Sequence, residues 1–270
     1  YAAELDPSTM ATVKPGTEIV EDMISGRFQE GVYRFFEASS MRKIKDKYVF
    51  IYSRFTEEGE FGLPTSNYTL AYAYGDNPLG PFTYGGTIID GRARGTNEKG
   101  EVIATATIAG NTHGSIAEIN GKGYVFYHRQ TGPTEYTRQA MVAPIEVVVE
   151  EGPGGKVTIS EAEYTSEGFE TDGLDLYKRY PAGIACYYTG PTPIHQEYPN
   201  YYHSGSYMQP FYLSDETYED PYQLDVNCNV VVNNTNGSVV GYKYFNFDGL
   251  KKGKTLLDIS MKPLGVEGRI

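Results

Sequence analysis

The sequence of 270 residues contains no tryptophan, two cysteines and no long apolar run, and each absence excludes a class of protein. Without about 18 consecutive apolar residues, no membrane-spanning helix is expected. Cys186 and Cys228 cannot define a disulfide framework, and they form no Cys-x-x-Cys motif. Basic residues are also few, with 23 Lys and Arg against 35 Asp and Glu. A formal charge of −12 without a basic block argues against binding to nucleic acid.

Several catalytic signatures are missing as well. The sequence has no Gly-x-Ser-x-Gly elbow, no Walker loop, no His-Glu-x-x-His pair and no dinucleotide fingerprint. It starts at Tyr1 without a Met or a charged-then-apolar leader, which indicates a mature product or a fragment. The reaction classes that these motifs mark therefore have no support in the sequence.

Tyrosine is abundant instead, with 25 Tyr beside 12 Phe. A tyrosine ring offers an apolar face with a hydroxyl at its edge, which suits the faces and rims of sugar rings. Tyrosine is also common in β-proteins in general. Composition therefore leaves a sugar-binding surface and an ordinary β-fold equally open.

Short alternating apolar segments predict an all-β fold. Such segments occur at residues 48–52, 70–74, 124–127 and 145–149, and turn residues bound them. After a Tyr-, Pro- and Gly-rich stretch, strands are expected again at 229–232, 238–247 and 255–261. The Asn236-Gly237 pair predicts a hairpin. One short helix is expected near residues 6–10.

Two segments 75 residues apart repeat one pattern. Ser40-Met41 and Ser115-Ile116 are each followed by a polar turn and then by Tyr-Val-Phe. The triplet comes one residue later in the second copy, which we interpret as an inserted Gly123. A recurring hairpin is typical of the blades of a β-propeller. A β-sandwich with two similar hairpins is the alternative.

Glu37 is the first candidate for chemistry. It directly follows Phe35 and Phe36 and precedes small residues, so we expect a poorly solvated carboxylate. Desolvation raises a carboxyl pKa, as a general acid requires near neutral pH. The competing interpretation is a structural ion pair with Arg34 or Arg42.

His113 and Arg138 are the other candidates. In the repeat, Thr112 corresponds to Glu37 and His113 to the next residue, so both strands are expected near one centre. His113 could bind a ligand or a metal there, although a lone histidine is more often structural. Arg138 could donate to sugar hydroxyls, or form a surface ion pair with Glu135.

These segments together resemble family 43 glycoside hydrolases, five-bladed β-propellers that act on xylan, arabinoxylan and arabinan. The resemblance rests on residues 35–43 followed by 47–50, on 112–116 with 124–129, and on Arg138-Gln139. It extends through 166–169 and 178–183, and residues 239–247 are similar to the opening of a C-terminal carbohydrate-binding module.

The resemblance implies a role for each candidate. Glu37 would be the general acid of an inverting hydrolysis, in which a second carboxylate activates water. His113 would face the propeller channel, where the family often holds calcium. Arg138 and His113 would contact the sugar. The family's base is an Asp in its first blade, and neither Asp6 nor Asp22 matches that context.

We therefore expect a secreted or periplasmic hydrolase of β-xylosidase or α-L-arabinofuranosidase type. Residues 1–185 would form the C-terminal blades of a β-propeller, 186–228 an aromatic-rich connection, and 229–270 the start of a β-sandwich carbohydrate-binding-like module. The N-terminal blades, with the base, would lie outside this chain as its partner. The expected ligand is an oligo- or polysaccharide. A non-catalytic polysaccharide-binding propeller or a surface-adhesion protein would need no base.

Overall fold

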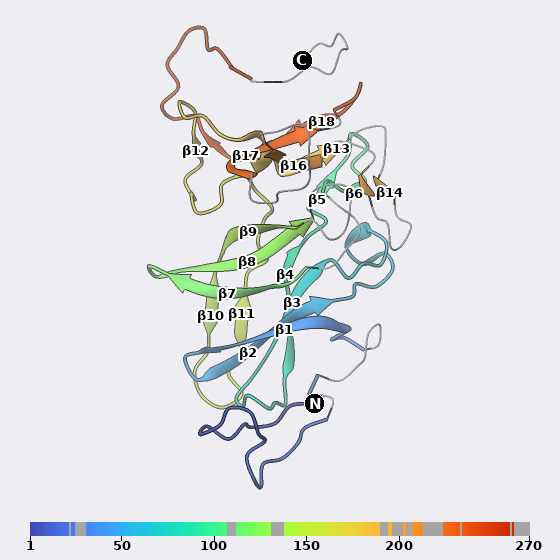
Figure 1. Ribbon diagram of the computed structural model, residues 1–270, viewed down its shortest axis with the longest axis vertical. Coiled ribbons are helices and arrows are strands. Elements are labelled where there is room, and N and C mark those ends of the chain that lie inside the picture. The colour runs from blue at the N-terminus through green and yellow to red at the C-terminus, as the bar shows by residue number, and fades with distance from the viewer. Residues whose placement is uncertain are drawn as a thin grey trace.

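The computed structural model describes residues 1–21, 23–24, 31–106, 112–130, 138–189, 194–195, 202–203, 207–212, 224–232, 234–259 and 261. Its regular structure is almost entirely β, which confirms the predicted fold class (Figure 1). The two short 3₁₀ helices are η1 (Glu60–Gly62) and η2 (Ala182–Ile184). The strands are β1 (Phe35–Ile44), β2 (Lys47–Arg54), β3 (Thr69–Gly75), β4 (Thr83–Asp90), β5 (Arg94–Thr96), β6 (Val102–Ala104), β7 (Gly114–Ile119), β8 (Lys122–Gln130), β9 (Arg138–Ile145), β10 (Val147–Val149), β11 (Val157–Ile159), β12 (Leu174–Asp175), β13 (Tyr187–Thr189), β14 (Ile194–His195), β15 (Tyr202–His203), β16 (Tyr207–Tyr212), β17 (Leu224–Val232), β18 (Val239–Gly241) and β19 (Phe245–Asn246).

The short helix expected near residues 6–10 is a turn. The Ser8 backbone N–H donates to Asp6 Oδ1 at 2.8 Å, and the Met10 N–H donates to the Asp6 carbonyl at 2.7 Å. The aspartate side chain thus satisfies the first free N–H of the turn, and the chain does not continue as a helix. In the described part of the chain, no helix is long and apolar enough to cross a bilayer.

The first sheet holds β1, β2, β3 and β4 in sequence order, with every neighbouring pair antiparallel. The turn Lys45-Asp46 joins β1 to β2, and Lys45 has φ +53°, in the left-handed region that tight hairpin turns use. Alternate residues of β2 and β3 enter two different apolar clusters, because successive side chains of a strand point to opposite faces. Both faces of this sheet are therefore covered.

The second sheet, of β7, β8 and β9, repeats the first hairpin at the same spacing. Ser40 faces Ile51 across the first hairpin, and Ser115 faces Phe126 across the second, so the register is the same in both copies. The predicted insertion at Gly123 is wrong. The turn lies at the same distance from the paired serine in both hairpins, and the similar Tyr-Val-Phe triplets are instead displaced by one position relative to the turns.

The two sheets meet along β1 and β7, which lie side by side in Figure 1. The repeat-related serines touch, with Ser40 Oγ 2.9 Å from Ser115 Oγ. Arg42 Nε also donates to the Ile116 carbonyl at 3.2 Å. The larger apolar cluster fills the space between the sheets and extends to β10 and β11. This seam brings the starts of both hairpins together.

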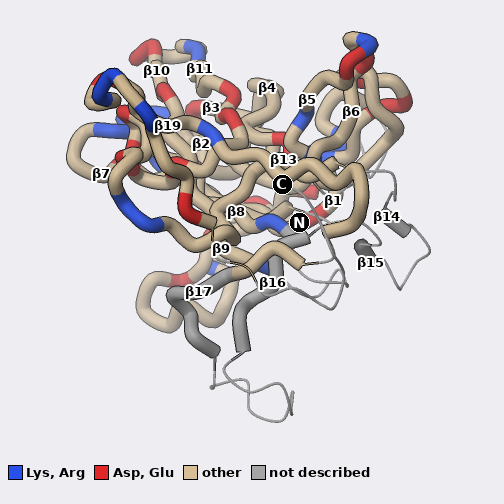
Figure 2. The backbone as a smooth tube through the Cα atoms, turned by 90° about the horizontal axis from the view of Figure 1, so that it is seen from above, with Lys and Arg blue, Asp and Glu red and all other residues tan. Residues whose placement is uncertain are grey.

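At the other end of the first hairpin, buried Lys47 joins three turns. Its Nζ donates to Asp76 Oδ1 and to the Gly152 carbonyl. Asp46 accepts the Gly152 N–H, and Asp76 accepts the Gly154 N–H, both at 2.8 Å. The hydrogen bond with Asp76 raises the pKa of Lys47 and lowers the pKa of Asp76. We call Lys47, Asp46, Asp76, Gly152 and Gly154 together the turn clamp. Along the rest of the chain, Figure 2 shows acidic and basic residues interspersed with one another.

The C-terminal strands pair with earlier parts of the chain. β18 pairs with β13, and β19 pairs in parallel with β12. The Asn236-Gly237 turn forms, with Gly237 at φ +84°, yet β17 pairs with β16. The predicted hairpin is therefore wrong, because the strands on either side of the turn find other partners. Residues 255–259 and 261, expected as a strand, have no regular structure.

The closed five-bladed ring and the boundaries at 185/186 and 228/229 stay predictions. The expected aromatic-rich connection, 186–228, lies largely outside the described residues. The expected module at 229–270 contributes β18 and β19, which pair with strands at 187–189 and 174–175. Its opening thus packs directly on the region before it.

Candidate active site

Glu37 lies near the start of β1, opposite Ser53 of β2. The two preceding phenylalanines pack against other rings. The ring centres of Phe35 and Tyr52 are 5.6 Å apart, and those of Phe36 and Phe55 are 4.9 Å apart. Register shifts flank Glu37 on both sides, and the next residue has φ +58°. The expectation of a poorly solvated carboxylate is wrong for this chain, since the side chain is 41% exposed.

Glu37 meets His113 across the seam between the sheets. The distance from Glu37 Oε1 to His113 Nε2 is 2.8 Å, and the histidine side chain is 37% exposed. The arginines that competed for Glu37 have bonds of their own. Arg34 donates to the Phe55 carbonyl and to Glu57, and Arg42 donates to the Ile116 carbonyl. The structure thus brings two of the three predicted site residues into contact.

Thr112, the repeat equivalent of Glu37, anchors the histidine that follows it. Its side chain is buried, and its Oγ1 donates to the Tyr68 carbonyl at 3.4 Å. Its own carbonyl accepts the hydroxyl of Ser53. Gly114 follows His113, and a Cβ there would lie 2.3 Å from the Phe126 carbonyl. Glycine is needed for this close approach, which leads the chain from His113 directly into β7.

His128, in β8, is a site residue that the sequence reasoning did not single out. The His113 backbone N–H donates to His128 Nε2 at 3.0 Å, and the two rings lie edge to face at 5.2 Å. Burial, helped by the charges of Arg138 and His113, lowers the pKa of His128 to about 4. His128 is therefore neutral at physiological pH.

Arg138 begins β9, opposite Gln130 at the end of β8. It is exposed, and its charge reaches His128, so it lies at the same end of the sheet as the Glu37–His113 pair. Glu135, its predicted ion-pair partner, lies outside the described residues. The three predicted site residues and His128 thus gather at one end of the two hairpins.

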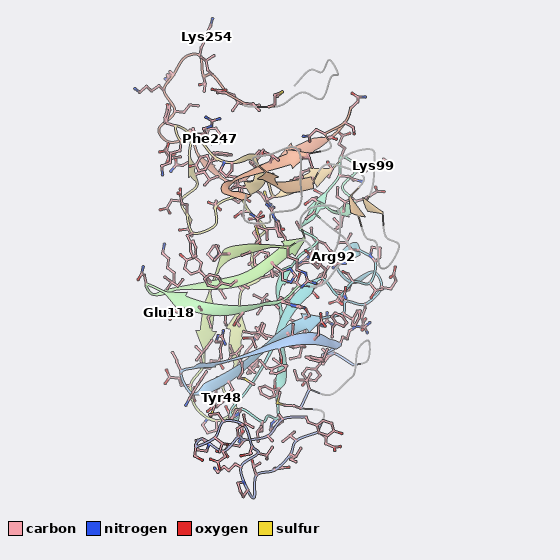
Figure 3. All side chains as sticks on the ribbon, viewed as in Figure 1. Tyr48, Arg92, Lys99, Glu118, Phe247 and Lys254 are labelled. Carbon is pink, nitrogen blue, oxygen red and sulfur yellow. The ribbon has the colours of Figure 1, made fainter. Side chains whose placement is uncertain are left out.

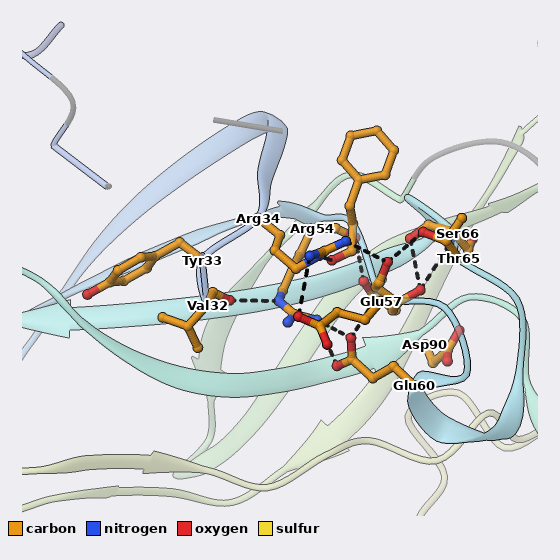
Figure 4. A network of polar contacts seen from close by, with 12 residues as sticks. Val32, Tyr33, Arg34, Arg54, Glu57, Glu60, Thr65, Ser66 and Asp90 are labelled. Atoms are coloured by element: carbon orange, nitrogen blue, oxygen red, sulfur yellow. Dashed lines mark hydrogen bonds and ion pairs between the residues drawn. The ribbon is translucent and has the colours of Figure 1, made fainter. Parts of the chain in front are cut away.

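A network of polar contacts holds the segment that leads into β1 (Figure 4). Arg54 Nε donates to the Val32 carbonyl at 3.2 Å, and Arg54 also binds Glu60 at 2.9 Å. Glu60 in turn accepts the Glu57 N–H at 2.7 Å, and Glu57 binds Arg34 at 3.3 Å. Because Arg54 is buried, this network fixes the approach of the chain to Glu37.

The described residues do not by themselves fit calcium. Calcium takes six to eight oxygen ligands, whereas the donors here are imidazole nitrogens and one carboxylate that is already paired. Among the residues that the structure describes, no group of three or more His, Cys, Asp or Glu is placed to hold a metal ion. Asp6 is engaged in its turn, and Asp22 lies outside the described residues.

Comparison with known proteins gives relatives of one kind. No protein-family model matches the chain. A xylosidase/arabinosidase of Thermoclostridium stercorarium is 31% identical over 94% of this chain and 49% of its own length. A beta-xylosidase of Xylanibacter ruminicola is 36% identical over 42% of this chain and 28% of its own length. A crystal structure of a glycoside hydrolase family 43 arabinoxylan arabinofuranohydrolase from Bacillus subtilis covers 67% of this chain and 33% of its own, at 20% identity and a TM-score of 0.39. The chain spans at most about half the length of these curated relatives.

Proposed function

Because the chain belongs to glycoside hydrolase family 43, we propose that it supplies the acid side of an active site that hydrolyses xylose- or arabinose-containing hemicellulose. The names of the relatives support the substrate class. The observation that carries the proposal is the pairing of Glu37 with His113 at 2.8 Å, between repeat-related hairpins. Arg138 lies at the same end of the sheet and is exposed, so it can donate to sugar hydroxyls.

In this mechanism Glu37 protonates the departing glycosidic oxygen. With its proton on Nε2, His113 donates to Glu37 Oε1, and in this proposal Oε2 carries the transferred proton. The C–O bond to the leaving group breaks as Oε2 gives up this proton. The His113 hydrogen bond becomes stronger as Glu37 becomes a carboxylate, so it favours the transition state over the ground state.

Inversion also requires a base that activates water on the opposite face of the sugar, with the two carboxyl groups about 6.5–9.5 Å apart. We assign that base to an Asp outside this chain, in the N-terminal blades expected from the family resemblance. The proposal gives no step to calcium. A hemicellulose substrate lies outside the cell, so we also propose a secreted or periplasmic location.

The test replaces Glu37 by Gln in the complete protein. Glu37→Gln keeps the shape of the side chain and removes the acid, so kcat on phenyl xyloside or phenyl arabinoside should fall by about 10²–10⁴. A dinitrophenyl leaving group needs little protonation, so its hydrolysis should fall much less. Binding of xylo-oligosaccharides should persist.

Glu118→Gln is the matched control. Glu118 is exposed on β7, and Figure 3 shows it at the far end of that strand from the site. Its replacement should leave both substrates unaffected. Unchanged turnover of the phenyl glycosides in Glu37→Gln would contradict the proposal and favour a polysaccharide-binding protein.

A further inference from the structure

We propose that His128 and Ser53 are positioning residues that clamp the peptide bond between Thr112 and His113, and so set the direction in which His113 reaches Glu37. This inference rests on the proposed role of Glu37 as the acid. It concerns two side chains from different sheets that hold the two polar atoms of one peptide group. We call this arrangement the peptide clamp.

The two hydrogen bonds have opposite senses. The carbonyl of Thr112 accepts the hydroxyl of Ser53, in β2, and the N–H of His113 donates to Nε2 of His128, in β8. A peptide group is planar, so hydrogen bonds to its oxygen and from its N–H on opposite edges restrain the orientation of the plane. The next rotatable bonds lead directly to the His113 side chain. The peptide clamp therefore restricts the positions that the imidazole can reach.

Ser53 also connects the peptide clamp to the acid itself. It is the register partner of Glu37 across β1 and β2, and it is fully buried. One residue thus contacts the strand of Glu37 through the sheet and the peptide of His113 through its hydroxyl. Any shift between the sheets along the seam would disturb both, so the 2.8 Å contact between Glu37 and His113 is maintained from both sides.

Histidine at position 128 suits the positioning role but does not favour the stability of the fold. Its Nε2 accepts a hydrogen bond, so the neutral ring carries its proton on Nδ1. That buried Nδ1 meets no hydrogen-bond partner among the described residues. A buried donor without a partner disfavours folding, and an apolar side chain would avoid this cost. The imidazole of His128 therefore contributes the hydrogen-bond acceptor for the His113 N–H.

Two substitutions in the complete protein separate these roles. The side-chain oxygen of Gln reaches about as far as Nε2 of histidine, whereas that of Asn reaches only as far as Nδ1. His128→Gln should therefore keep the acceptor, and His128→Asn should lose it. We expect kcat on phenyl xyloside to fall about 10- to 100-fold in His128→Asn and less than about threefold in His128→Gln. KM should change little in either.

The leaving group makes the test specific. Misplacing the acid slows phenyl glycosides, which need protonation, but hardly slows dinitrophenyl glycosides. His128→Asn should thus lose phenyl xyloside turnover selectively, and Ser53→Ala should do the same from the other side of the peptide. Equal losses on both substrates, or equal behaviour of Asn and Gln at position 128, would overturn the inference.

The outcomes are distinguishable from a failure of the proposed function. If Glu37→Gln retains phenyl glycoside turnover, the assignment of the acid fails. If Glu37→Gln is inactive but His128→Asn and Ser53→Ala match the wild type, the acid stands and the peptide clamp is refuted. Should His128→Asn not fold, as judged by thermal unfolding, Ser53→Ala and His128→Gln still decide: loss in the first with retention in the second supports the clamp, and any other pair of results refutes it.

Discussion

From Ser40 and Ser115 onward the hairpins β1–β2 and β7–β8 have the same register and the same turn position, and they differ in the residues that come before. At corresponding positions the first has Glu37 followed by alanine, and the second has a threonine followed by His113. One hairpin contributes the proposed acid, and the other contributes the anchor and the partner. A repeated frame thus builds an asymmetric site when the residues and the local register change near its start, while the turn positions and the register beyond the two serines stay the same.

The largest expected difference in unfolding free energy between the two hairpins comes from their core residues. Ile51 is fully buried, whereas its equivalent Phe126 is half-buried and packs on Phe169 at 6.1 Å between ring centres. Ile51→Ala should lower the free energy of unfolding by about 2–5 kcal/mol. Phe126→Ala should cost roughly half of that or less, because more of its ring is already in water. Urea unfolding measures both, and an equal or larger loss in Phe126→Ala would contradict the difference.

A smaller effect is expected at the turns. Lys47 is buried in the turn clamp, whereas its equivalent Lys122 is exposed and donates to Thr171 Oγ1 at 3.3 Å. Lys47→Met should lower the unfolding midpoint, and Lys122→Met should change the free energy of unfolding by less than about 0.5 kcal/mol. Similar midpoints for the two variants at pH 7 would show that the turn clamp adds no stability.

The turn clamp also predicts a pH dependence. The pKa values of Asp46 and Asp76 are lowered from 3.8, mainly by bonds from Gly152 and Lys47, so their stabilisation is complete above about pH 4 and is lost as the pH falls through the lowered values. The pKa of Lys47 is raised above 10.5, so its stabilisation is complete below that pH and is lost as the pH rises through the raised value. The difference in the free energy of unfolding between the wild type and Lys47→Met should therefore become smaller at both low and high pH.

The smallest effect concerns the point where the two copies touch. Ser40 Oγ and Ser115 Oγ are 2.9 Å apart. A double-mutant cycle of Ser40→Ala and Ser115→Ala should give a coupling of about 0.5–1 kcal/mol. The same cycle with Ser40 and exposed Thr158, on β11, should give a value near zero. Equal couplings in the two cycles would mean that the serine contact does not join the sheets.

Local patterns predicted the strands and the turns of both hairpins, because alternation and turn chemistry act between near neighbours. They failed where pairing is decided at long range. The turn at Asn236-Gly237 forms, but the strands beside it pair with β16 and β13. The inserted Gly123 followed from matching similar triplets, whereas the register of the hairpins decides the true correspondence.

The site shows the same limit. Glu37, His113 and Arg138 could be named from sequence, yet the Glu37 side chain is partly exposed although two phenylalanines precede it, because their rings pack on Tyr52 and Phe55. His128 was missed because its role requires β7 and β8 to be paired, so that its ring reaches a backbone N–H 15 residues earlier. No local signal marks a side chain whose partner is a distant main-chain atom.

The matched register of the two hairpins, from Ser40 and Ser115 to their turns, also determines where this chain tolerates insertions and deletions. One residue added between Glu37 and the turn at 45–46 would slide β1 along β7 by about 3.3 Å and reverse the faces of its side chains. Ser40 would then pass Ser115, and Glu37 would lose His113. The exposed turn at Glu98, Lys99 and Gly100, between β5 and β6, lies outside this constraint, because a change of length there leaves both hairpins intact. Natural length variation among relatives should therefore concentrate in such loops and be absent from the two matched turns.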